Sequence, residues 1–227
     1  MDDVWMIALT FLFSYLVGSI PFGLLIVRLI SGKDIRSVES GRTGGTNAMR
    51  AAGLFAGAMT AGMDVFKGVA TGWIAWSFVP EHLWVRVVAA LLAIMGHNYS
   101  IFLIEKHTNG KIRLRGGAGG APALGGAISL WPPAAIIILL VGGLVFLIVG
   151  YASLTTISVA VVSIIIFTVR AFQGLSPWFY VLYGFGALII VTWALRPNLE
   201  RLKNRTERVV GLRAYLNKRG QNGVNNQ

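Results

Sequence analysis

Long apolar runs alternate with short polar connections along most of this chain. Most runs approach or exceed the roughly 20 residues that an α-helix needs to cross the hydrocarbon core of a bilayer. The fourth run is shorter, and we expect a half-helix there, with Trp131, Pro132 and Pro133 turning the chain back. The seven runs are residues 4–30, 54–79, 83–104, 121–130, 133–149, 153–169 and 177–195. This pattern predicts an all-α integral membrane protein with about seven transmembrane helices.

The chain is expected to form one transmembrane helical domain over residues 1–219. The first run is interpreted as a retained span, because it is too long for a signal peptide and lacks a basic start. From residue 199 onward, apolar residues recur at helical spacing among basic ones, which predicts a basic interfacial helix over about 199–219. An ordinary solvated C-terminal helix is the alternative. Residues 220–227 are polar and are expected to form a disordered tail.

Basic residues concentrate in three polar regions, whereas the other connections are nearly uncharged. Lysine and arginine mark cytoplasmic loops. Seven crossings with the N-terminus outside place all three basic regions, the C-terminus and both glycine-rich loops on the cytoplasmic side. An even number of crossings would separate the first loop from the tail. The basic residues are Lys33, Arg36, Arg42 and Arg50 in the first region, Lys106, Lys111, Arg113 and Arg115 in the second, and Arg196, Arg201, Lys203, Arg205, Arg208, Arg213, Lys218 and Arg219 in the third.

The composition excludes several classes of function. The 227 residues are 55% hydrophobic and 13% charged, far from the roughly 25% charged residues of a soluble domain. The net charge of +11 would suggest nucleic acid in a soluble protein, but basic cytoplasmic loops explain it here, so no nucleic-acid partner is expected. Without cysteine, disulfides, thiol catalysis and cysteine–zinc sites are excluded. Three scattered histidines and no carboxylate cluster predict no metal site.

A glycine-rich loop over residues 40–47 follows the first apolar run and has the composition of an anion site. Its glycines allow backbone N–H groups to converge, its side chains add donors, and its arginines add charge. It is neither a P-loop nor a dinucleotide fingerprint. The alternative is a flexible connector. The residues concerned are Ser40, Gly41, Arg42, Gly44, Gly45, Thr46, Asn47 and Arg50.

A second glycine-rich loop repeats this chemistry after the third apolar run. Arg113 and Arg115 precede glycines at positions 116, 117, 119 and 120, and Ala121-Pro122 then begins a helix. A helix N-terminus behind glycines binds anions. Close helix packing through small residues is an equally weighted reading of the same glycines.

Charged and titratable residues also lie inside the apolar runs. Asp64 and Lys67 are three residues apart and share a helical face. Charges within a membrane are expensive and indicate function, although a self-neutralising structural pair is the alternative. His97 is either a packing residue or a participant in chemistry. With no nucleophile motif in the sequence, a catalyst of this kind would work by positioning and charge stabilisation.

Several of these motifs together resemble the bacterial membrane glycerol-3-phosphate acyltransferases that use acyl phosphate. The resemblance holds from about residue 14 to residue 157. It implies a seven-helix fold in the bacterial inner membrane with its active site at the cytoplasmic face. The motifs that carry it are Gly18-Ser19-Ile20-Pro21-Phe22-Gly23, Ser40-Gly41 with Gly44 and Thr46-Asn47, Arg50, Asp64 with Lys67-Gly68, Gly96-His97 with Tyr99, and Ser153-Leu154.

The resemblance implies transfer of an acyl chain from acyl phosphate to the 1-hydroxyl of glycerol 3-phosphate, without metal, cofactor or acyl-enzyme. The expected partners are acyl phosphate, glycerol 3-phosphate and membrane lipid. Catalytic roles are expected for Ser40, Arg50 and Asn198, with Asp64, Lys67 and His97 in support. Substrate phosphate is expected to bind Gly41, Arg42, Gly44, Gly45, Thr46, Asn47, Arg115, Gly116, Gly117 and Gly119.

The chain departs from the family pattern at two positions. Ala118 stands where the second motif usually has a lysine, and Leu195 stands near a usual histidine. Arg42, Arg113 or Arg115 is expected to supply the missing charge. The departures keep two other functions open: a non-catalytic or altered-substrate relative that binds phospholipid or acyl phosphate, and a small anion transporter.

Overall fold

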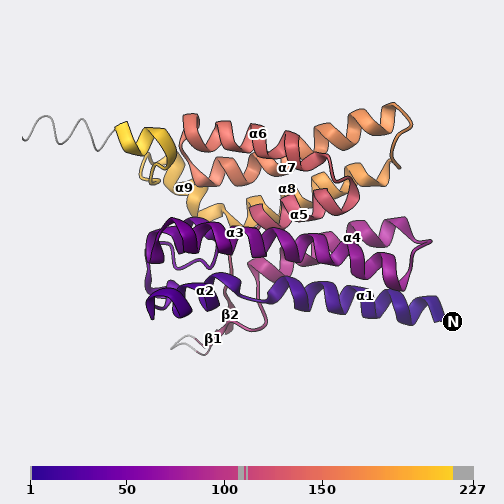
Figure 1. Ribbon diagram of the computed structural model, residues 1–227, viewed down its shortest axis with the longest axis horizontal. Coiled ribbons are helices and arrows are strands. Elements are labelled where there is room, and N and C mark those ends of the chain that lie inside the picture. The colour runs from indigo at the N-terminus through magenta and orange to yellow at the C-terminus, as the bar shows by residue number, and fades with distance from the viewer. Residues whose placement is uncertain (1, 107–109, 111, 217–227) are drawn as a thin grey trace, which may run out of the picture.

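The computed structural model describes residues 2–106, 110 and 112–216. Its long helices run side by side, with the shorter α2 and α9 and a small hairpin gathered at the same end of the bundle (Figure 1). The helices are α1 (Asp2–Ser19), α2 (Phe22–Ser31), α3 (Gly45–Phe78), α4 (Leu83–Asn98), α5 (Gly120–Leu130), α6 (Ala134–Leu144), α7 (Ala152–Phe172), α8 (Phe179–Ala194) and α9 (Arg196–Lys203), with a 3₁₀ turn, η1 (Ile35–Ser37), and a π-helical turn, η2 (Val145–Val149).

The first apolar run is divided into α1 and α2, where the sequence predicted one continuous segment. Proline at position 21 has no N–H to continue the helical ladder, so α1 ends at Ser19 and α2 begins at Phe22. The break leaves the carbonyl of Ile20 without its usual helical partner. The Nζ of Lys67 donates to that oxygen at 3.1 Å. The predicted intramembrane lysine therefore supports a break in the helix packed beside it.

Helix α3 begins earlier than its apolar run and bends within the glycine-rich N-terminal part. Ala52 and Gly53 have non-helical backbone angles, and the φ of +88° at Gly53 favours glycine. The predicted run over residues 54–79 corresponds to the part after this bend. The part before it, from Gly45, packs back against Gly57 and Ala61. The bend therefore holds Thr46 and Arg50 beside the long part of the same helix.

The largest apolar core lies among α4, α5, α7 and α8, with α6 packed against α7. The buried hydroxyl of Tyr183 in α8 donates to the carbonyl of Ala123 in α5, so a polar bond ties the half-helix into this core. Helix α5 has 11 residues and ends at Leu130, directly before Trp131 and two prolines. The short fourth segment and the reversal after it, both predicted from the sequence, are therefore present.

The polar connection after α4 differs from the prediction. The third apolar run was expected to continue to residue 104, but α4 ends at Asn98. Residues Ile104–Lys106 (β1) and Ile112–Leu114 (β2) then form a two-stranded antiparallel hairpin, with Glu105 opposite Arg113. This hairpin departs from the predicted all-helical fold. It leads directly into the second glycine-rich loop.

The predicted basic helix over residues 199–219 is not continuous. Helix α9 ends at Lys203, and Arg205 has a φ of +57°, which a helix does not allow. Val209 then forms a β-bridge with Tyr151, and the N–H of Val210 donates to Gly150 at 2.8 Å. Helical backbone resumes over residues 211–216. Residues 217–219 and the predicted disordered tail over 220–227 lie outside the described residues.

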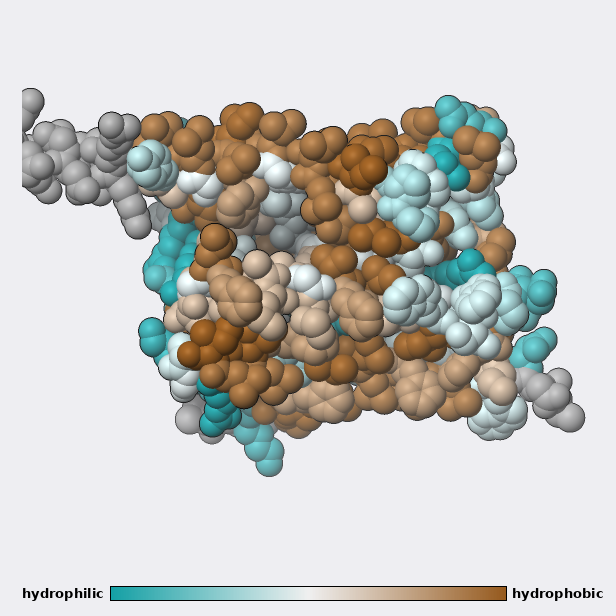
Figure 2. Space-filling view, in the orientation of Figure 1, coloured by the Kyte–Doolittle hydropathy of each residue, from teal (hydrophilic) through white to brown (hydrophobic). Residues whose placement is uncertain are grey.

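The apolar surface fits a lipid environment. Figure 2 shows a hydrophobic band over the middle of the molecule, with hydrophilic residues gathered toward the ends. Within the part of the chain that the structure describes, two helical stretches could cross a membrane by length and composition, Asp3–Ser31 and Ala152–Phe172, or three if α8 and α9, bent by 68°, count as one. Other apolar helices are shorter. The predicted count of seven crossings and the orientation of the termini therefore stay predictions.

Candidate functional site

The two glycine-rich loops meet at one end of the helix bundle. The N–H of Thr43 in the first loop donates to the carbonyl of Gly116 in the second at 3.3 Å. A cavity of about 560 Å³ opens where they meet. Its lining comes from both loops, from α3, α4, α5, α7 and α9, and from the segment after α9. The shared pocket that the sequence predicted therefore exists as a structural feature.

The first loop is held in shape by Asn47. Its buried amide nitrogen lies within hydrogen-bond distance of the carbonyls of Ile35, Val38 and Arg42, at 3.1, 2.9 and 2.9 Å. These bonds fold residues 35–42 around the start of α3. The amide donors are used within the protein, so Asn47 supports the loop, a role that the family resemblance also implies for it. Binding of phosphate by Asn47 stays a prediction.

A cluster of ion pairs outside the cavity connects the segment before the first glycine-rich loop to the hairpin. The guanidinium of Arg36 contacts Asp34 at 2.7 Å and Glu105 at 3.7 Å. Hydrogen bonding from Arg36 lowers the pKa of Asp34 to about 2. Arg115 contacts Glu105 at 2.7 Å and donates to the carbonyl of Arg36 at 3.4 Å. Arg115, predicted as a phosphate ligand, is therefore bound to a carboxylate and lies outside the cavity lining.

The glycines of the second loop serve close packing and helix capping. A Cβ at Gly117 would overlap the imidazole of His97, and one at Gly116 would overlap the backbone of His97 and Asn98. Gly119 is the N-cap of α5, with a φ of +89°. Unlike Gly116 and Gly117, it lines the cavity. Both interpretations of the second glycine-rich loop therefore apply. Gly116 and Gly117 serve close packing, whereas Gly119 begins a helix whose N-terminus faces the cavity.

Two helix N-termini border the cavity. Gly44 is the N-cap of α3, and Gly45 and Thr46 follow it in the lining; Gly119 and Gly120 have the same places at α5. The first N–H groups of a helix lack intrahelical partners, and the helix dipole makes this end positive. Both ends therefore favour an anion in the cavity.

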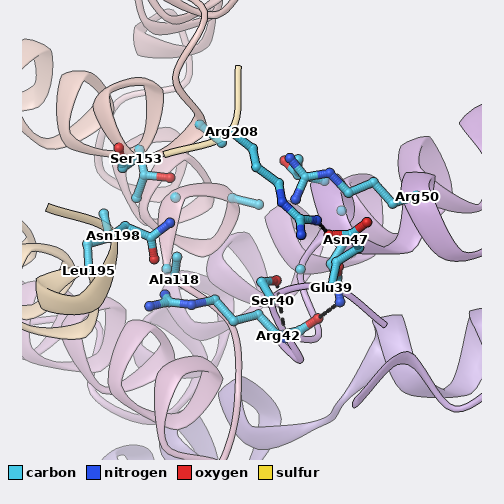
Figure 3. Close-up of a pocket in the computed structure, with 18 of the residues that line it drawn as sticks. Glu39, Ser40, Arg42, Asn47, Arg50, Ala118, Ser153, Leu195, Asn198 and Arg208 are labelled. Atoms are coloured by element: carbon cyan, nitrogen blue, oxygen red, sulfur yellow. Dashed lines mark hydrogen bonds and ion pairs between the residues drawn. The ribbon is translucent and has the colours of Figure 1, made fainter. Parts of the chain in front are cut away.

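Arg42 extends from the first loop across to the second (Figure 3). Its guanidinium donates to the carbonyls of Ala194 at 2.6 Å and Gly117 at 3.5 Å. These residues immediately precede Leu195 and Ala118, which both line the cavity and where the family resemblance leads one to expect other side chains. Burial, with repulsion from Arg201 and Arg113, lowers the pKa of Arg42. A half-buried cation therefore lies beside both of these positions.

Four arginines line the cavity, and one of them is matched by a carboxylate among the described residues. Arg208 is paired with Glu39. Within the described residues, Arg42, Arg50 and Arg201 have no acidic group within ion-pair distance, although all three line the cavity. Arginines without a counter-charge, beside helix N-termini, are groups that proteins use to bind phosphate.

The predicted Asp64–Lys67 pair forms in α3, with 2.9 Å between Nζ and Oδ1. The Nδ1 of His97 lies 3.5 Å from the same carboxylate oxygen. Asp64 and His97 line the cavity, whereas Lys67 points away toward the α1–α2 break. All three side chains are almost completely buried. The charges of Asp64 and Lys67 neutralise each other, as in a structural ion pair. Asp64 and His97 are in addition part of the cavity lining.

The structure gathers most of the residues predicted for the site. Gly41, Lys67, Arg115, Gly116 and Gly117 lie outside the lining. Those within it are Ser40, Arg42, Gly44, Gly45, Thr46, Asn47, Arg50, Asp64, His97, Gly119 and Asn198.

Sequence reasoning assigned no role to Glu207, and it noted Ser153 only as part of a motif. Ser153 donates to Glu207 at 2.7 Å, and the Nδ2 of Asn198 donates to the other oxygen of the same carboxylate at 3.2 Å. All three residues line the cavity. The available signal was weak, because Glu207 is one of two glutamates, with Glu200, in a strongly basic tail.

Comparisons with known proteins show what this chain is similar to. A family profile described as "Glycerol-3-phosphate acyltransferase" matches residues 8–205. The chain is 37% identical to a glycerol-3-phosphate acyltransferase of Thermus thermophilus, over 90% of this chain and 96% of that protein. It is 35% identical to glycerol-3-phosphate acyltransferase 2 of Moorella thermoacetica, over 93% of this chain and 100% of that protein.

Solved structures give the same result. The crystal structure of PlsY (YgiH), an integral membrane glycerol 3-phosphate acyltransferase, in its glycerol 3-phosphate form, superposes with a TM-score of 0.76 and 28% identity, covering 95% of this chain and 99% of that one. The lysophosphatidic acid form gives a TM-score of 0.74, with the same identity and coverage. With a family profile that spans most of the sequence and close relatives over nearly its whole length, this chain belongs to the glycerol-3-phosphate acyltransferase family.

Proposed function

We propose that this protein transfers an acyl chain from acyl phosphate to the 1-hydroxyl of glycerol 3-phosphate, giving lysophosphatidic acid and inorganic phosphate. The observation that carries the proposal is the cavity in which Arg42, Arg50 and Arg201, unpaired among the described residues, lie beside the N-termini of α3 and α5. The names of the relatives support glycerol 3-phosphate as the acceptor. The choice of acyl phosphate as donor follows from the family resemblance and the phosphate-binding character of the cavity.

In this mechanism the protein positions its substrates and stabilises charge. The arginines and the N–H groups of the two helix N-termini hold the phosphate groups. The 1-hydroxyl attacks the acyl carbonyl, the bond between acyl carbon and phosphate oxygen breaks, and the departing phosphate takes the hydroxyl proton. Positive groups at the cavity stabilise the charge that develops on the carbonyl oxygen. The apolar surface between helices accommodates the acyl chain. The mechanism requires no metal or cofactor.

The proposal includes seven crossings of the bacterial inner membrane, with the N-terminus outside and the cavity at the cytoplasmic face. Because the chain has no cysteine, single cysteines give unambiguous labelling. In sealed right-side-out vesicles, an impermeant maleimide should label Glu81→Cys but not Lys33→Cys or Arg205→Cys. Inverted vesicles should give the reverse. Labelling of Lys33→Cys and Arg205→Cys from opposite sides would refute this topology.

The activity itself is tested with detergent-purified protein, acyl phosphate and radiolabelled glycerol 3-phosphate. Lysophosphatidic acid and phosphate should form in equal amounts. Arg50→Ala should abolish turnover without changing the thermal unfolding midpoint, because Arg50 is an exposed side chain at the cavity. Lys203→Ala, an exposed residue outside the cavity, serves as the matched control. Absence of product from folded wild-type protein would defeat the proposal.

One observation favours a second reading, a relative that binds these ligands without transferring the acyl group. Ala118 places a methyl group in the cavity where the family resemblance leads one to expect an ammonium. Binding of glycerol 3-phosphate to folded wild-type protein, together with no acyl product under any donor concentration, would favour this second reading over catalysis.

A further inference from the structure

Besides its arginines, the cavity is lined by a carboxylate that neutral donors hold in place. Figure 3 shows Ser153 and Asn198 on one side of the cavity and Arg50 and Arg208 on the other. The carboxylate of Glu207 joins the first pair, because Ser153 Oγ donates to one oxygen at 2.7 Å and Asn198 Nδ2 donates to the other at 3.2 Å. These residues come from α7, from α9 and from the segment after α9.

Glu207 differs from the other carboxylates that line the cavity. Glu39 is paired with Arg208, and Asp64 is paired with Lys67. Among the residues that the structure describes, Glu207 has no basic group within ion-pair distance and is held by two neutral donors. An ionised carboxylate has about four lone-pair sites. Two are used, which leaves acceptor sites for donors that enter the cavity.

This chemistry selects hydroxyl groups. A free carboxylate accepts hydrogen bonds from O–H donors and repels phosphate. A ligand with a phosphate at one end and hydroxyls at the other is therefore oriented in the cavity, with its anion toward the unpaired arginines and the helix N-termini and its hydroxyls toward Glu207. Ser153 is buried and Tyr151 pairs with Val209, so the carboxylate is fixed on both sides by the fold.

We propose that Glu207, positioned by Ser153 and Asn198, is the residue that recognises the hydroxyl groups of the acceptor and so makes a polyol phosphate, rather than any phosphate monoester, the preferred ligand. This inference rests on the proposed function, because it assigns one end of the acceptor to one side of the same cavity. With this role, Glu207 is a carboxylate that contacts the acceptor in a cavity whose other expected ligands are arginines and the backbone of glycines.

The test compares two ligands of equal charge. Glycerol 3-phosphate carries two hydroxyls, and n-propyl phosphate carries none. Their dissociation constants are measured by calorimetry on the detergent-solubilised full chain, for wild type, Glu207→Gln and Glu200→Gln. Glu200 is an exposed glutamate on α9, outside the cavity, and is the matched control. Binding is measured without acyl donor, so the result does not depend on turnover.

Wild type should prefer glycerol 3-phosphate, and Glu207→Gln should reduce that preference by about 10-fold or more, as expected for losing hydrogen bonds to a charged group. Glu200→Gln should keep it. A change in charge alone, or a purely structural role, would alter both affinities by the same factor and leave the preference intact, which would overturn the proposal. If Glu207→Gln does not fold, Glu207→Asp is used instead, because its shorter side chain keeps the charge but moves it away from the ligand. It should reduce the preference for glycerol 3-phosphate in the same way.

The two proposals fail separately. Folded wild-type protein that prefers glycerol 3-phosphate in a Glu207-dependent way but forms no acyl product would refute the proposed activity and leave the hydroxyl site standing. Product formation with an unchanged preference in Glu207→Gln would refute the hydroxyl site alone. Wild-type protein that binds neither ligand would overturn both.

Discussion

Arg42 donates a hydrogen bond to the backbone carbonyl of Ala194, with 2.6 Å between Nη2 and the oxygen. This bond links a loop near the beginning of the chain to the end of α8, 152 residues later. It fixes a cation next to Ala118 and Leu195, where the family resemblance leads one to expect other side chains. The charge at this place in the cavity is therefore supplied from a different part of the sequence.

Arg42→Ala should lower kcat/KM for glycerol 3-phosphate by about 10- to 150-fold, because a hydrogen bond to a charged group contributes about 1.5–3 kcal/mol. Adding Ala118→Lys to that variant should restore part of the loss, because both side chains reach the same region. Steady-state kinetics in detergent measure both effects. Equal activity of the single and double variants would show that position 118 cannot replace Arg42.

The Asp34–Arg36 ion pair should make the stability of the folded protein depend on pH in the acid range. The pKa of Asp34 falls from 3.8 to about 2 in the folded protein, so its contribution is present above about pH 4 and is lost as the pH falls through about 2. Asp34→Asn should lower the thermal midpoint slightly at pH 7, since partly exposed pairs contribute little. The difference from wild type should shrink between pH 4 and pH 2. A difference that is constant with pH would contradict this account.

Gly117→Ala should destabilise the protein by about 1–3 kcal/mol, because the added methyl overlaps the His97 imidazole and the packed backbone must shift. Gly62→Ala is the matched control: Gly62 is exposed within α3, and its added Cβ meets no atom within 4 Å. Alanine there should change stability little or raise it by up to about 1 kcal/mol. Thermal unfolding of both variants in detergent provides the measurement, and equal midpoints would argue against close packing at Gly117.

Asp64→Asn should cost about 3–5 kcal/mol of stability, because it leaves the buried Lys67 ammonium without its counter-charge. Adding Lys67→Met should recover part of that loss, since the unpaired charge is then removed as well. Denaturant titration of the three proteins tests this. A double variant less stable than Asp64→Asn would show that the bond from Lys67 to the Ile20 carbonyl matters more than the ion pair.

The sequence predicted the features that depend on local spacing. The Asp64–Lys67 pair follows from helical periodicity, and the short α5 follows from the glycines before it and the prolines after it. The meeting of the two glycine-rich loops was predicted from their shared charge, and the bond from Thr43 to Gly116 is the structural counterpart.

Contacts between distant segments were not predictable in this way. Arg115 looked equivalent to Arg42, but its pairing with Glu105 depends on a hairpin that the apolar pattern did not reveal. The role of Glu207 depends on Ser153, 54 residues earlier, and on the interruption of the basic helix at Arg205. Periodicity describes one element at a time, so it carried no information on these partners.

The position of Glu207 after α9 also has a consequence for biosynthesis. Chains grow from the N-terminus at about 5–20 residues per second. A nascent chain made only as far as Lys203 already contains Arg42, Arg50 and both glycine-rich loops, but not the carboxylate that Ser153 and Asn198 hold. The ribosome therefore adds the proposed phosphate ligands first, and an unfinished chain lacks the carboxylate that we propose distinguishes glycerol phosphate from other phosphate monoesters.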